Sequence, residues 1–158
     1  MASTETIQQP RVDLEDAARS AYRAMNHFDN ATARLELDPL LRELIRVRAS
    51  MLNGCAYCVD MHTKDARAKG ETEQRLYAVA AWHEAPFFSP AERAALALTD
   101  ALTKLAGNPL PDAVVAEAEE QLGAEGLAAA TWIIVTINAW HRVAIASHLE
   151  AGTYQPGE

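Results

Sequence analysis

The chain has 158 residues, of which 49% are hydrophobic and 23% charged, so it can bury the core of one globular domain. Its formal net charge is −8 with a pI near 5.1, and its basic residues are scattered apart from Arg42, Arg46 and Arg48. Because phosphate contacts need clustered Lys and Arg, this composition argues against a nucleic-acid-binding protein.

The N-terminal segment 1–12 is polar and lacks the apolar stretch of a signal peptide, and we expect it to be disordered. The longest apolar run, around residues 128–135, is too short to span a bilayer. We therefore expect a soluble cytoplasmic protein that makes no membrane contact. In a reducing cytosol, two closely spaced cysteines are more often catalytic or metal-binding than structural.

Helix start and stop signals predict an all-α fold of about six to seven helices. The clearest signals are the cap Asp38-Pro39, the break Asn53-Gly54, and the capping box that opens at Ser89. The expected helices cover residues 14 to about 26–30, 39–53, 55–69, 73–84, 90–106, 112–122 and 125–149. No repeat or linker interrupts them, so residues 13–150 are predicted to form one domain, followed by a C-terminal tail at 151–158.

Residues 53–62 read NGCAYCVDMH and contain the two cysteines of the chain, Cys55 and Cys58, with His62 four residues further on. On a helix these three side chains share one face. Cα atoms three residues apart on a helix are roughly 5 to 6 Å apart, which is within the range that a disulfide needs. The pair can therefore close and open with little movement of the backbone.

Three interpretations of this motif remain open from the residues alone. The helix start after Asn53-Gly54 favours negative charge at Cys55, and His62 can accept a thiol proton, so the motif can form an activated dithiol. Two inert core cysteines are an alternative, because free cysteine is often buried. A zinc site is a third, although one helix offers only three ligands.

The same stretch, together with Glu43 on the preceding helix, resembles the carboxymuconolactone decarboxylase/alkylhydroperoxidase D (AhpD)-like family. The resemblance rests on Glu43, Asn53, Cys55, Tyr57, Cys58 and His62, and extends to residues 89–96 and 137–142. It covers roughly residues 35 to 150. It implies an AhpD-like helical bundle that assembles as a trimer or hexamer.

By this resemblance the protein is an alkyl hydroperoxide reductase that needs no cofactor and no metal. Cys58 is the cysteine that attacks the peroxide and Cys55 the one that resolves it, although the helix-dipole argument favours Cys55 as the more acidic thiol. Glu43 and His62 form a proton relay. A dithiol donor, either lipoamide or a thioredoxin-like protein, then reduces the pair.

Two positions depart from the family pattern. Tyr57 stands where well-known members have histidine; it is a possible accessory residue that could donate a hydrogen bond but could not act as a base near neutral pH. His141 stands where the family often has asparagine, and we expect a local partner for it. Without the family pattern, the alternative for Glu43 is an exposed side chain that forms an ion pair with Arg42, Arg46 or Arg48.

Two other functions are compatible with the sequence. One is a non-redox enzyme of the decarboxylase branch, which would not need the cysteine pair. The other is a redox-sensing helical oligomer whose thiols oxidise without turnover. The presence of both cysteines with Glu43 favours the hydroperoxide reductase.

Overall fold

The computed structural model describes residues 11–157, and the regular secondary structure of this part is all helical, as expected. The elements are α1 (Leu14–Ala17), α2 (Arg19–Thr32), α3 (Pro39–Asn53), α4 (Ala56–Ala68), α5 (Glu73–Ala78), the short 3-10 helix η1 (Val79–Ala81), α6 (Pro90–Thr103) and α7 (Asp112–Ser147). The predicted disorder at the N-terminus concerns mainly residues 1–10, which lie outside the described residues.

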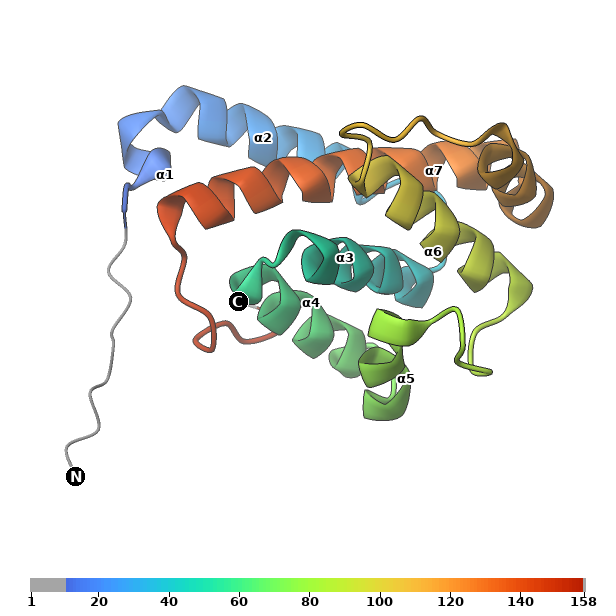
Figure 1. The fold of residues 1–158 in the computed structure, drawn as a ribbon. Helices are drawn as coiled ribbons and strands as arrows, with labels where there is room; N and C mark the ends of the chain where they lie inside the picture. The colour runs from blue at the N-terminus through green and yellow to red at the C-terminus, as the bar shows by residue number, and fades with distance from the viewer. Residues whose placement is uncertain (1–10, 158) are drawn as a thin grey trace.

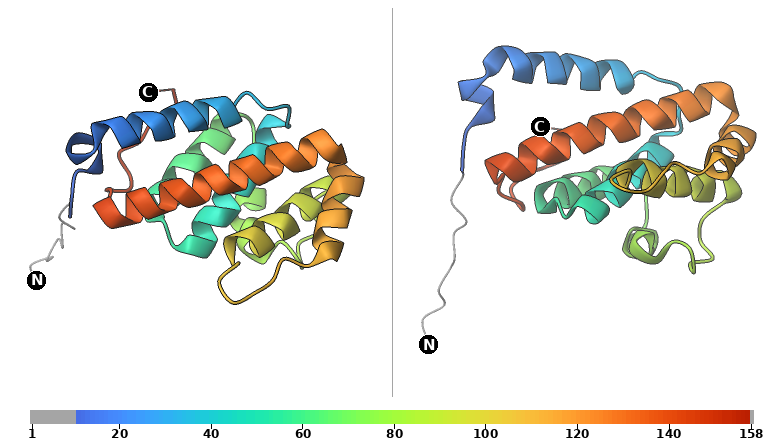
Figure 2. Two further views of the ribbon diagram at one scale, coloured as in Figure 1. Left: turned by 90° about the horizontal axis from the view of Figure 1, so that it is seen from above. Right: turned by 45° about the horizontal axis from the view of Figure 1, so that its top comes forward.

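The helices are arranged around α7, which crosses the whole molecule (Figure 1). In the tilted view of Figure 2, α2 lies along one side of α7, and α3, α4 and α6 lie on the other. Because α7 contacts α2, α3 and α6, its second half is the centre of the hydrophobic core. This explains why its middle is apolar on most faces.

Local signals set most helix ends, as the sequence predicts. Asp38 Oδ1 accepts the backbone N–H groups of Leu40 and Leu41, both at 2.9 Å, at the start of α3. Ser89 and Glu92 form the expected capping box of α6. Gly54 ends α3 with φ = 67°, a left-handed conformation that glycine adopts without steric cost.

Several helix boundaries differ from the expectation. The first expected helix is interrupted at Ala18, whose backbone is not helical, and then continues past residue 30 to Thr32. Packing of Phe28 against Trp132 of α7 accompanies this extension. The helices expected at 112–122 and 125–149 follow each other directly in α7, and Gly123, whose backbone (φ = 72°, ψ = 169°) is not helical, bends the chain between them where the sequence predicts a break. α7 ends at Ser147, two residues before the expected end. The helix expected at 73–84 is shorter, because α5 ends at Ala78 and the 3-10 helix η1 follows.

Two large buried clusters hold the described helices together, and a smaller one surrounds the cysteines. One brings residues of α3 and α6 against α7, and the other packs α3, α4, α5 and α6 around Trp82 and Phe88. Between α3 and α6, Arg48 and Asp100 form a two-point ion pair, with distances of 2.5 Å (Nε–Oδ1) and 2.8 Å (Nη2–Oδ2). Helix α3, which leads into the turn that carries Cys55, therefore packs in both clusters.

By length and hydropathy α7 could cross a membrane, but a single helix of this kind is weak evidence of a span, and α7 packs against α2, α3 and α6. The chain after α7 returns to α4. Lys64 Nζ donates to the carbonyls of Gly152 (3.2 Å) and Tyr154 (2.9 Å), and the Tyr154 hydroxyl donates to Asp65 at 2.7 Å. The C-terminal residues therefore lie against the helix that carries Cys58.

Candidate active site

The two cysteines lie at the turn between α3 and α4, where the sequence places them. Cys55 is the N-cap residue of α4, and its sulfur accepts the backbone N–H of Cys58 at 3.3 Å. The two sulfurs are joined as a disulfide, with Cα atoms 5.3 Å apart. Only 2% of Cys55 and 4% of Cys58 is exposed, so access to the sulfurs depends on a cavity.

Glu43 and His62 meet although they come from different helices. His62 Nδ1 lies 3.1 Å from Glu43 Oε2, and the donor in this hydrogen bond is the Nδ1–H of the imidazole. In the neutral ring this leaves Nε2 as the basic nitrogen. His62 is one helical turn after Cys58, so it lies on the same face of α4.

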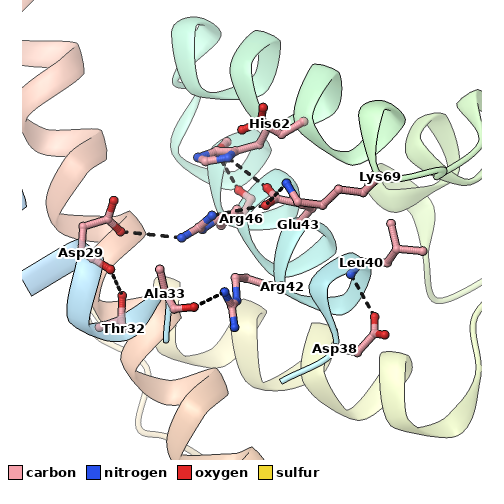
Figure 3. Close-up of polar contacts among 12 residues, drawn as sticks. Asp29, Thr32, Ala33, Asp38, Leu40, Arg42, Glu43, Arg46, His62 and Lys69 are labelled. Atoms are coloured by element: carbon pink, nitrogen blue, oxygen red, sulfur yellow. Dashed lines mark hydrogen bonds and ion pairs between the residues drawn. The ribbon is translucent and has the colours of Figure 1, made fainter. Parts of the chain in front are cut away.

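Glu43 is buried, with 1% of its surface exposed, rather than the surface residue that its own helix suggests. Two cations share its other oxygen: Arg46 Nη1 at 3.3 Å and Lys69 Nζ at 3.1 Å from Oε1. Figure 3 shows Arg46, His62 and Lys69 converging on this carboxylate. The expected pairing with a neighbouring arginine therefore occurs, but as part of a buried cluster.

The charge state of Glu43 follows from this cluster. Burial raises its pKa, but the hydrogen bond and charge of His62 and the charges of Arg46 and Lys69 outweigh burial and lower the pKa to about 2. Glu43 is therefore ionised at any pH near neutrality. It can orient His62 and stabilise positive charge on the ring, but it cannot itself exchange a proton there.

A cavity of about 290 Å³ opens beside this cluster, between α2, α4 and α7. Cys58 and His62 line it, whereas Cys55 and Glu43 do not. One wall is apolar, with Met61, Ile137, Trp140, Val143, Ala144 and Leu149. Asn26, Asp29, Arg46 and Asp65 give the remaining wall a polar character. A small organic molecule could therefore reach one sulfur and the imidazole together.

Tyr57 also lines the cavity and packs against the two cysteines. Burial, and after it the charge of Asp60, raises the pKa of its phenol. The side chain therefore remains a neutral hydroxyl at neutral pH, which fits a hydrogen-bond donor and not a base. Tyr22 of α2 reaches the same cavity and stacks edge-on against Trp140.

Glu43, His62 and Asp65 place one ligand atom each within 4.8 Å of one another, a spacing that could suit a metal ion. However, Arg46 and Lys69 already bind Glu43, and the Tyr154 hydroxyl binds Asp65. Two cations this close would repel a third. The cluster is therefore better explained by its ion pairs.

His141 is a residue that sequence reasoning left without a role. It is buried, and its partners Ser50 and Asn53 lie on α3, 91 and 88 residues away, rather than locally. Burial above all, then the charges of His62 and Arg142, lower its pKa to about 4. Lys69 was also missed as a partner of Glu43, whereas Arg46 was among the expected partners but was expected at the surface.

We expect these two shifted groups to make stability depend on pH. His141 has a pKa of about 4 in the folded chain and 6.5 in the unfolded chain. As the pH drops below 6.5, the unfolded chain takes up a proton at this residue before the folded chain does, so the free energy of unfolding falls. At about 1.4 kcal/mol per pKa unit, the loss approaches about 3 kcal/mol near pH 4. Glu43 adds a further loss below 4.5, as pH falls towards about 2.

Urea unfolding of the wild type and of His141→Gln, at intervals from pH 3 to 8, measures this dependence. In the variant, the free energy of unfolding should no longer change between pH 6.5 and 4 because of residue 141, but it should still fall below pH 4.5 because of Glu43. Equal slopes in both proteins over the upper interval would contradict the assignment to His141.

Comparison with known proteins agrees with this geometry. The model of the carboxymuconolactone decarboxylase family matches residues 19–101, which include Glu43, both cysteines and His62. The chain is 40% identical over 136 residues to the uncharacterized protein YdfG of Bacillus subtilis, covering 86% of this chain and 92% of that protein. It is also 35% identical over 68 residues to the uncharacterized protein YnjA of Escherichia coli, covering 43% and 37% of the two chains.

Solved structures share the fold. A protein of unknown function from Agrobacterium tumefaciens, described as a candidate antioxidant defence protein AhpD, superposes with a TM-score of 0.88 at 32% identity, covering 92% of this chain and 100% of that one. An AhpD-core protein from Ralstonia eutropha (TM-score 0.77, 21% identity, 88% and 74% covered) and the debrominase Bmp8 (TM-score 0.77, 17% identity, 96% and 95% covered) are more distant. At such identities the likeness concerns the fold alone.

Proposed function

The chain belongs to the carboxymuconolactone decarboxylase family and has the AhpD-like fold, and from this premise we propose that it is a thiol-dependent alkyl hydroperoxide reductase. The observation that carries the proposal is the lining of the cavity. Cys58 and His62 reach it together, and Cys55 lies behind Cys58 within bonding distance. A peroxide in the cavity would thus meet Cys58 first, and Cys55 would be in place to form the disulfide with it afterwards.

In the reduced protein, His62 is the base that takes the Cys58 proton. The ionised Glu43 accepts the Nδ1–H, fixes the ring and stabilises the imidazolium that forms, which is the arrangement that activates nucleophiles in many hydrolases. Glu43 thus acts by orienting His62. Arg46 and Lys69 compensate the charge of this carboxylate in its buried site.

The Cys58 thiolate attacks the terminal oxygen of ROOH, the O–O bond breaks, and ROH leaves with the proton that His62 supplies. Cys58 is now a sulfenic acid. Cys55 attacks its sulfur, water leaves, and the disulfide forms. One hydroperoxide is thereby reduced and two thiols are oxidised.

The burial of both sulfurs bears on the electron donor. A thiol that reduces a disulfide must approach one of its sulfurs directly. Here Cys58 is reached through a cavity of about 290 Å³, which admits a slender dithiol such as dihydrolipoamide more easily than the surface of a folded thioredoxin-like protein. We place the reaction in the cytoplasm, where such donors are kept reduced.

Two other functions differ in what they require of the sulfurs. A decarboxylase of the same family would not need Cys55 or Cys58. A redox sensor would need both but would not turn over. A sulfur that faces an organic-sized cavity beside an oriented imidazole favours turnover over either.

The test is the consumption of cumene hydroperoxide by the purified protein with dihydrolipoamide as donor. We expect multiple turnovers, with one alcohol formed per donor oxidised. Without donor, the reduced protein should consume about one equivalent of peroxide per chain and lose two titratable thiols. Loss of the thiols without turnover would indicate a sensor. If neither turnover nor thiol loss is observed, a redox function is excluded.

We also propose that the protein is a homo-oligomer formed through α7. An outward stripe on this helix contains Ala128, Trp132, Val135, Ala139, Arg142 and Ala146, spaced alternately by four and three residues. Trp132 and Val135 are 49% and 44% exposed. This spacing is typical of helices that pack against a second helix along a seam, and a second copy of the chain would cover it.

Sedimentation velocity tests the oligomer. The wild type should sediment as a trimer or hexamer. Val135→Glu should shift it towards monomer, because it puts a charge in place of an exposed apolar side chain in the stripe. Tyr77→Glu is the matched control, since Tyr77 is 72% exposed on α5, away from the stripe. A monomeric wild type at tens of micromolar would contradict the proposal.

A further inference from the structure

A network of buried polar side chains joins α7 to the last turn of α3, just before the cysteines. His141 Nε2 lies 2.9 Å from Ser50 Oγ, and His141 Nδ1 lies 2.8 Å from Asn53 Nδ2. Asn53 Nδ2 also donates to Asn138 Oδ1 at 2.8 Å. His141 and Ser50 are almost completely buried, so these contacts are shielded from water.

The position of every proton in this network follows from the donors. The amide nitrogen of Asn53 can only donate, so His141 Nδ1 must accept. The neutral ring then carries its proton on Nε2 and donates it to Ser50 Oγ. The Ser50 hydroxyl in turn donates to the carbonyl of Arg46 at 2.7 Å. The lowered pKa of His141 agrees with this neutral form.

The side chains of this network belong to Ser50 and Asn53, the residues that flank the α3–α4 turn on which Cys55 lies. The carbonyl of Ser50 accepts the backbone N–H of Cys55 at 3.0 Å. Asn53 is the last residue of α3 and directly precedes Gly54, whose left-handed conformation reverses the chain. His141 is not among the residues that line the cavity. Its contacts therefore bear on the position of Cys55 and not on the substrate.

We propose that His141 is a positioning residue for the redox pair. Through Ser50 and Asn53 it holds the Gly54–Cys55 turn so that the Cys55 thiol remains close to Cys58. A thiol held in this way has a high effective concentration towards its partner, which favours closure of the disulfide. The inference takes from the proposed function only that the pair opens and closes.

The test measures closure of the pair in the absence of any peroxide. Wild type and His141→Ala are equilibrated in graded mixtures of reduced and oxidised dithiothreitol, free thiols are alkylated, and the alkylated fraction is counted by mass spectrometry. We expect the equilibrium constant for closure to fall about tenfold in His141→Ala, which corresponds to about 30 mV. His141→Gln, whose amide can accept from Asn53 or donate to Ser50, should recover part of the loss.

Thr136→Val is the matched control. Thr136 is equally buried on α7, but its hydroxyl bonds only to the carbonyl of Trp132 within its own helix, so closure should remain at the wild-type constant. If His141→Ala does not fold, Asn53→Ala should show the same shift. A folded His141→Ala, or in its place Asn53→Ala, that closes with the wild-type constant overturns the proposal. Because no peroxide is used, a failure of the peroxidase assay leaves this result interpretable.

Discussion

Replacing Cys58 with serine is expected to lower steady-state hydroperoxide consumption by roughly three orders of magnitude or more, because a serine hydroxyl is not ionised near neutral pH. Cys58 is the sulfur that faces the cavity, so no other thiol should replace it. The measurement is peroxide loss with dihydrolipoamide as donor. Dimedone should label no sulfenic acid in this variant.

Cys55→Ser is the matched comparison, because it removes the same disulfide but leaves the attacking thiol. It should reduce about one equivalent of peroxide and then stop, with a sulfenic acid on Cys58 that dimedone traps. The reverse outcome, in which Cys58→Ser forms the trapped acid, would exchange the two roles. Turnover that is unchanged in both variants would contradict the hydroperoxide reductase.

Glu43→Gln is expected to have the second largest effect. Glutamine keeps the volume but removes the anion that orients His62 and that pairs with Arg46 and Lys69. We expect kcat to fall by roughly 10² to 10⁴-fold, as when general-base assistance is lost. The free energy of unfolding should fall by about 3 kcal/mol, because two cations lose a buried partner. Stopped-flow peroxide consumption and urea unfolding measure the two effects.

Glu71→Gln separates the two effects of Glu43→Gln. Glu71 is also a buried carboxylate, and it accepts from Arg75 Nε at 2.9 Å and from the Thr72 N–H at 2.8 Å, outside the cavity. Its loss should destabilise the fold and leave kcat unchanged. If Glu43→Gln retained the wild-type kcat, the assignment of Glu43 as the residue that orients His62 would be wrong.

The helices of this protein were largely predictable because their ends depend on nearby residues. The side chain of Asp38 reaches backbone groups within three residues, and the capping box of Ser89 and Glu92 spans the same distance. The errors occurred where tertiary packing decided the outcome. Phe28 and Tyr22 pack on α7, and α2 accordingly continues through residues that favour a helix end.

The candidate site was only partly predictable. The spacing of Cys55, Cys58 and His62 on one helix was sufficient to place them together. Nothing in the periodicity indicated that Glu43 would be buried, that Lys69 would bind it, or that α2 would supply Asn26 and Asp29 to the cavity. Those facts depend on how three helices pack.

The amino-acid sequence by itself determined most of the helix ends, the cysteine turn and the face of α4 that carries Cys58 and His62, because each depends on contacts within about one helical turn. Only the tertiary structure decided which sulfur faces the cavity and which carboxylate orients the imidazole. It also decided that His141 contacts the end of α3. Those partners are 19 to 91 residues apart in the chain, and they meet only because α3, α4 and α7 pack around one core.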